Sequence, residues 1–84
     1  MMIKIILLVN NVVIISKIEE VVSELGEPDC KLIDPYILNQ SSLSMEPWLL
    51  NITTQSEFMI SSDKILTITD PTEKLIEKYN SLVK

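Results

Sequence analysis

Two carboxylates, one thiol and one glycine are the residues of this chain closest to catalytic or ligand-binding chemistry. Glu19 and Glu20 could supply a carboxylate pair, but adjacent residues on a strand point to opposite faces. Cys30 is the only cysteine, and the chain has no histidine to activate it. The only glycine, Gly26, cannot form a glycine-rich phosphate loop. We therefore expect no enzymatic activity, and we predict no catalytic, metal or cofactor site.

The size and charge of the chain favour self-association over binding to nucleic acid. A chain of 84 residues is one domain, and it buries roughly 60–65% of its unfolded surface. Such a small core often gains stability from staples or from oligomer formation, and a single cysteine excludes an intrachain disulfide. Twelve acidic residues against seven lysines give a net charge of −5, which does not attract phosphate over the whole surface.

The most apolar segment, residues 2–15, does not have the form of a membrane or secretion signal. Asn10 and Asn11 divide it into two short runs, whereas a membrane helix needs about 20 apolar residues. A secretory signal would also need a longer apolar core and a small-residue cleavage site. We expect a cytoplasmic protein with no membrane partner.

The same segment predicts a β-hairpin. Asparagine tolerates a positive φ, so Asn10-Asn11 between two β-branched runs is typical of a tight turn. The first strand, residues 2–9, is apolar on both faces, whereas a strand of a single open sheet would have one polar face. Both faces of this strand must therefore be covered.

Residues 16–26 allow two interpretations. A helix is favoured locally by the spacing of four apolar residues, Ile18, Val21, Val22 and Leu25. The alternative is a long second strand, residues 12–24, which turns at residues 26–29 and returns as a third strand over residues 30–38.

The middle of the chain predicts two further features of the sheet. Pro35 removes a backbone donor from the strand over residues 30–38, so this strand should lie at an edge or carry a bulge. Apolar residues alternate with polar ones over residues 47–61, which is typical of a half-buried strand, either continuous or interrupted near Gln55 and Ser56.

The end of the chain predicts a helix over residues 71–83. Asp70 is placed to cap it, with Pro71 at the first helical position and Glu73 completing a capping box. An apolar stripe follows, made of Leu75, Ile76, Tyr79, Leu82 and Val83.

Two segments resemble the signatures of the Sm and Sm-like (LSm) family. Residues 60–68, ISSDKILTI, are similar to the second signature, in which a strand ends in hydrophobic–Arg–Gly–Asp/Asn and an apolar strand follows one residue later. The run IILLV-NN-VVIISKIEEVV, followed by CKLID, resembles the first signature. Together the match covers residues 3–68 and indicates a divergent small member, of the kind found in marine phages.

The resemblance implies a mainly β fold, a small five-stranded and strongly bent antiparallel barrel of the SH3 type with a C-terminal helix. It places residues 16–24 in the second strand and overrules the local helical interpretation. If the protein is phage-encoded, its location is the host cytoplasm. The expected strands cover residues 2–9, 12–24, 30–38, 47–61 and 64–69.

The family's RNA site is altered in this sequence. Sm-like proteins stack a uracil between the basic residue of the second signature and a side chain of the first-signature loop. Ser61 and Ser62 replace the Arg and Gly here, and the matching loop, residues 29–31, has neither an aromatic residue nor an Arg. We therefore expect RNA binding to be weak or absent. The candidate nucleic-acid contacts are Lys31, Ser61, Asp63 and Lys64.

The resemblance also implies a homo-oligomeric ring of roughly five to seven subunits, closed by head-to-tail contacts. In the family, the last two strands present their edges to the neighbouring subunits. The candidate interface residues are Phe58, Ile60, Ile65, Leu66 and Ile68. The expected function is a non-catalytic ring that scaffolds or binds a partner. The alternatives are an RNA-binding ring with altered base specificity and, if residues 16–25 are helical, a small α+β protein-interaction domain.

Overall fold

The computed structural model describes residues 2–83 and shows a mainly β protein with one α-helix in this range. A single 3-10 turn, η1, separates the last two strands. The elements are β1 (Met2–Leu8), β2 (Val13–Glu20), β3 (Cys30–Leu38), β4 (Met45–Pro47), β5 (Glu57–Ile60), η1 (Ser62–Lys64), β6 (Ile65–Thr69) and α1 (Glu73–Leu82).

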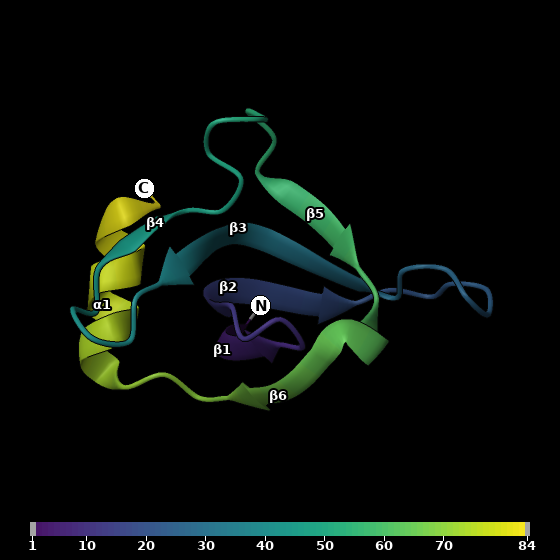
Figure 1. Ribbon diagram of the computed structural model, residues 1–84, viewed down its shortest axis with the longest axis horizontal. Coiled ribbons are helices and arrows are strands. Elements are labelled where there is room, and N and C mark those ends of the chain that lie inside the picture. The colour runs from purple at the N-terminus through teal and green to yellow at the C-terminus, as the bar shows by residue number, and fades with distance from the viewer. Residues whose placement is uncertain (1, 84) are drawn as a thin grey trace.

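The strands form one antiparallel sheet in the order β4-β3-β2-β1-β6, and β5 also pairs with β3 (Figure 1). The first and last strands, β1 and β6, are neighbours. No pairing joins β5 to β6 within the described residues, so the sheet is strongly curved but not closed. The expected five-stranded closed barrel is therefore replaced by a six-stranded open sheet over this part of the chain.

The expected strand over residues 47–61 is not one continuous strand. β4 ends at Pro47, residues 48–56 form turns and loop, and β5 covers only Glu57–Ile60. β4 pairs with one half of β3 and β5 pairs with the other half. Between them Leu49 has a φ of +61°, and its carbonyl accepts hydrogen bonds from Ile52 and Thr53, which makes a turn. The break faces a bend in β3, where Asp34 has a φ of +53°. Pro35 follows it, and the β2–β3 register shifts there, which confirms the predicted bulge.

The helical interpretation of residues 16–26 is wrong, and the strand interpretation holds as far as Glu20. β2 pairs with β1 on one side and β3 on the other, so its backbone hydrogen bonds are made by the sheet. Residues 21–29, which we call the arm, leave the sheet as a projecting loop (Figure 1). Two members of the expected helical stripe, Val22 and Leu25, lie on the arm and are fully exposed.

The hairpin at Asn10-Asn11 is confirmed. Asn11 has a φ of +67°, and the backbone N–H of Leu8 donates to the carbonyl of Val12 at 2.9 Å. The side chain of Asn10 accepts a hydrogen bond from the N–H of Val12 at 3.1 Å. The register that follows places Ile6 opposite Ile14 in the core.

The core lies on one face of β1, and α1 packs on the other. The first face carries a cluster of fully or almost fully buried residues, Ile6, Leu8, Ile14 and Leu32. On the opposite face, Ile5, Leu7 and Leu75 of α1 line an apolar hollow of about 370 Å³. Ile5 and Leu7 are half-buried there, so the prediction that both faces of β1 are covered is confirmed only in part.

The helix begins two residues later than the sequence predicted, at Glu73. Thr72 is its N-cap, with a side-chain oxygen that accepts a hydrogen bond from Leu75 at 3.3 Å. Asp70, the expected cap, instead forms an ion pair with Lys4 of β1, so its carboxylate is used in holding the chain against the sheet. Pro71 therefore precedes the helix and does not open it.

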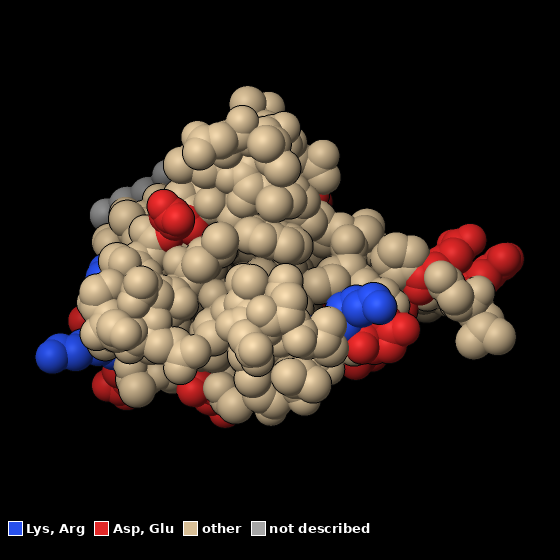
Figure 2. Space-filling view, viewed as in Figure 1, with Lys and Arg blue, Asp and Glu red and all other residues tan. Residues whose placement is uncertain are grey.

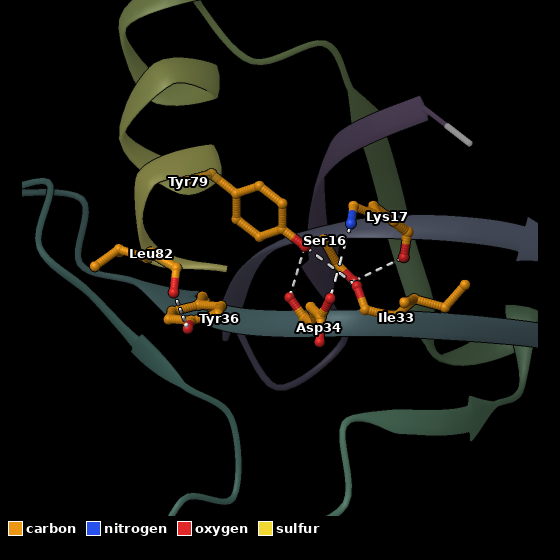
Figure 3. Close-up of polar contacts among 7 residues, drawn as sticks. All are labelled: Ser16, Lys17, Ile33, Asp34, Tyr36, Tyr79 and Leu82. Atoms are coloured by element: carbon orange, nitrogen blue, oxygen red, sulfur yellow. Dashed lines mark hydrogen bonds and ion pairs between the residues drawn. The ribbon is translucent and has the colours of Figure 1, made fainter. Parts of the chain in front are cut away.

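Tyr79 fastens α1 to the bend in β3 (Figure 3). Its ring is fully buried and meets Tyr36 edge to face at 5.8 Å. Its hydroxyl donates to the carbonyl of Asp34 at 2.7 Å and lies 3.2 Å from that of Ile33. Burial raises the pKa of Tyr79 to about 12. This contact satisfies a carbonyl that the irregular backbone at Asp34 would otherwise leave unpaired.

Candidate functional site

The joint between β5 and β6 is the first candidate site, because it sends two consecutive strands to different parts of the sheet. The joint is η1, a single 3-10 turn in which the N–H of Lys64 donates to the carbonyl of Ser61 at 3.0 Å. The strand before the joint pairs with β3, and the strand after it pairs with β1. In the described part of the chain neither has a second partner strand, so each presents a free backbone edge.

The five candidate interface residues fall into two groups. Leu66 and Ile68 of β6 are 59% and 44% exposed. The other three are half-buried within the chain: Phe58 packs edge to face on Trp48, and Ile60 and Ile65 pack against the core cluster. Sequence reasoning missed Met59, which is 49% exposed on β5. The alternating pattern could have shown it, because Met59 lies between two inward-facing residues.

An apolar groove follows β6 where the sheet is open. It has a volume of about 540 Å³. Its apolar lining comes from β2, β3 and β6, namely Ile18, Cys30, Ile65, Leu66 and Ile68. A further strand beside β6 would therefore find both free backbone groups and apolar side chains to cover.

The candidate nucleic-acid contacts lie close together, but the Lys31 ammonium is already paired with carboxylates of the same chain. β3 pairs with β5 so that Lys31 is opposite Met59, two residues from Ser61. The Lys31 ammonium lies 3.0 Å from Glu19 and 3.6 Å from Glu57. The hydrogen bond to Glu19 and the charges of both carboxylates raise the pKa of Lys31. Its charge is therefore largely compensated before any ligand arrives.

The base of the arm is joined to the η1 turn by a forked contact. The Asp29 carboxylate accepts one hydrogen bond from the N–H of Ser62 and one from its hydroxyl, each at 2.7 Å. These bonds lower the pKa of Asp29. The hollow between arm and turn, about 540 Å³, is lined by four acidic residues and no lysine. Those acids are Glu24, Glu27, Asp29 and Asp63.

Comparison with known protein families shows the family of this chain. The model of a family described as "Family of unknown function (DUF6561)" matches residues 1–84. The chain belongs to the DUF6561 family. A search of curated proteins finds no match.

The thiol of Cys30 in this DUF6561 protein is not activated as a nucleophile. Cys30 is buried, and burial, followed by the charges of Asp29 and Glu20, raises the pKa of its thiol. A thiol with a raised pKa stays protonated at neutral pH and is a poor nucleophile. Over residues 2–83 no group of three or more acidic, cysteine or histidine side chains could hold a metal ion. Within the same range no helix has the length and apolar character needed to cross a membrane.

Proposed function

We propose that this DUF6561 protein is a non-catalytic, self-assembling module of the Sm-like type that works in the cytoplasm. In this proposal, β6 of one copy pairs with β5 of the next, and the assembled ring scaffolds or binds a partner. The observation that carries it is the placement of β5 and β6, which are consecutive in sequence yet lie at separate free edges of the sheet.

Two different edges favour a ring over a two-fold dimer. A contact between unlike edges is head-to-tail, so each copy uses one edge on either neighbour, and repetition closes into a ring when the rotation permits. Edge strands with exposed apolar side chains are prone to aggregation unless they are paired or covered. Assembly would remove this hazard on β6, where Leu66 and Ile68 are exposed.

The size of the apolar contribution can be estimated from Leu66. Fully burying a leucine side chain is worth about 1.5–3 kcal/mol. Because 59% of Leu66 remains exposed, covering the rest contributes about 1–2 kcal/mol per contact. Ile68 and Met59 add to this, and the backbone hydrogen bonds of the new strand pair give it register.

The alternative of an RNA-binding ring has less support. The family's base-stacking position corresponds here to the joint next to an acidic hollow, which no lysine lines. Acidic walls repel phosphate, and a ring would repeat that repulsion in each subunit.

The decisive experiment measures the oligomeric state of edge variants. We expect the wild-type protein to give a homo-oligomer in native mass spectrometry and in sizing chromatography with light scattering. Leu66→Glu and Ile68→Glu should each give smaller species, because they place a charge in the strand pair. The matched control is Ile52→Glu, since Ile52 is 79% exposed but lies on a loop outside the sheet. A wild-type protein that stays monomeric at high micromolar concentration contradicts the proposal.

A further inference from the structure

The arm, residues 21–29, is the feature of the surface that self-assembly through β5 and β6 leaves unexplained. It projects from the sheet beyond the ends of β2 and β3 (Figure 1). Its base is held, because the N–H of Val21 donates to the carbonyl of Asp29 at 2.9 Å and Asp29 is fixed to Ser62. Its tip contains a turn, with Gly26 at a φ of +87°. The arm is thus an anchored projection with a defined tip.

Two large apolar side chains on the arm have no packing within the chain. Val22 and Leu25 have relative exposures of 105% each, as high as in an extended peptide. A single exposed apolar residue is ordinary on a protein surface. A pair on one projection, both without cover, is the arrangement expected of a segment that inserts into a pocket of another molecule.

The charge beside this pair identifies the kind of partner. Glu24 and Glu27 are on the arm, no lysine lies between Lys17 and Lys31, and Figure 2 shows acidic side chains along the projection. A negative arm is repelled by nucleic acid and by anionic lipid surfaces. It is attracted by a protein surface that carries cations around an apolar pocket.

A second copy of this chain is a poor source of those cations. Of the six lysines in the described range, Lys4, Lys17 and Lys31 are in ion pairs. Lys64 and Lys74 lie on separate elements, η1 and α1, and do not form a cationic rim around one pocket. Lys78 donates to the carbonyl of Leu43 at 2.6 Å. The complement of the arm is therefore found more readily on a different protein.

We infer that the arm docks a protein partner that presents an apolar pocket bordered by lysine or arginine side chains. Val22 and Leu25 enter the pocket, and Glu24 and Glu27 pair with its rim. This inference does not depend on the assembly proposed above, because the two use different residues and can fail separately.

The test uses the full chain and three fluorescent peptides of equal length as stand-ins for the partner. One alternates leucine with lysine, one serine with lysine, and one leucine with glutamate. We expect the leucine–lysine peptide to bind most tightly in fluorescence anisotropy, and its amide shift changes in two-dimensional NMR to fall on residues 21–29. Val22→Ser/Leu25→Ser should weaken this binding roughly tenfold or more, since two apolar side chains lose their burial.

Three comparisons make the result specific. Leu50→Ser/Ile52→Ser removes another exposed apolar pair, on a loop without acidic residues, and should leave binding within about twofold of wild type. Glu24→Gln/Glu27→Gln should weaken binding and reduce its dependence on salt. Both serine variants should keep the wild-type melting temperature, because the substituted side chains are exposed.

Several outcomes would overturn the inference. One is the absence of binding by all three peptides. Another is binding that survives Val22→Ser/Leu25→Ser or falls equally in the Leu50/Ile52 control. A loss of oligomeric state in the arm variant would show that a second copy occupies the arm. Tighter binding of oligouridine than of the leucine–lysine peptide would assign the arm to RNA.

Discussion

Replacing Tyr79 with Phe tests the contact that joins the helix to the sheet. The substitution keeps the buried ring and its edge-to-face contact with Tyr36, and removes only the hydroxyl. That hydroxyl donates to the carbonyl of Asp34 at 2.7 Å. The nearby carbonyl of Ile33 also accepts from the Ser16 hydroxyl at 3.0 Å (Figure 3). Tyr79→Phe should therefore leave Asp34, and not Ile33, without a side-chain donor.

The expected cost follows from leaving one carbonyl unpaired. A net hydrogen bond contributes about 0.5–1.5 kcal/mol, and an unsatisfied buried group costs about 1–3 kcal/mol. We expect Tyr79→Phe to lower the free energy of unfolding by about 1–2 kcal/mol. An 84-residue domain has a total stability of about 4–13 kcal/mol. A loss of this size should lower the melting temperature by roughly 5–15 °C.

The assay is urea unfolding and thermal melting at neutral pH, with Tyr36→Phe as the matched control. The Tyr36 hydroxyl makes a longer, exposed bond of 3.3 Å to the carbonyl of Leu82, so its removal should cost less than about 0.5 kcal/mol. Equal losses in the two variants, or no loss in Tyr79→Phe, would refute the idea that this hydroxyl holds the helix on the bend in β3.

Three further predictions concern Tyr79, the base of the arm and RNA binding. Because the folded state raises the pKa of Tyr79 to about 12, against about 10 in the unfolded chain, stability should fall as the pH rises from 10 toward 12. This loss should be smaller in Tyr79→Phe, as measured by urea unfolding against pH. Asp29→Asn should loosen the base of the arm, which would appear as faster amide hydrogen exchange at Ser62 with unchanged exchange in β1. Acidification should also loosen the base of the arm in the wild-type protein. Because hydrogen bonds from Ser62 lower the pKa of Asp29 in the folded state, this loosening should begin only below the usual aspartate pKa. RNA binding should be weak in fluorescence anisotropy with oligouridine and oligoadenine, and any residual affinity should vanish in Lys31→Glu/Lys64→Glu. Sub-micromolar, sequence-selective binding at physiological salt would contradict this prediction.

The structure changes how the edge hypothesis should be tested. Phe58, Ile60 and Ile65 are half-buried within the chain, so a charge at any of them would damage folding as well as the proposed assembly. Leu66 and Ile68 are exposed, and variants at these two positions separate assembly from stability. The same reasoning selects Val22 and Leu25 for the arm.

The sequence by itself determined the elements that depend on local preferences. The Asn10-Asn11 hairpin follows from the tolerance of asparagine for a positive φ between β-branched runs. The C-terminal helix follows from its apolar stripe, and the bulge at Pro35 from the missing backbone donor. In each case the residues that decide the structure are neighbours along the chain.

The tertiary structure decided the features that depend on residues far apart in sequence. Asp70 forms an ion pair with Lys4 of β1 and does not cap the helix. Strand pairing with β1 and β3 makes residues 16–20 a strand despite their helical spacing. The same effect separates β4 from β5, because the bend in β3 gives a partner strand two places to pair. It also leaves the helical stripe of Val22 and Leu25 exposed on the arm. Local spacing could not show these outcomes, because the backbone hydrogen bonds of a sheet join distant strands and outweigh the modest free energies of helix propensity. The loss of Asp70 as a cap costs little, because Thr72 caps the helix in its place.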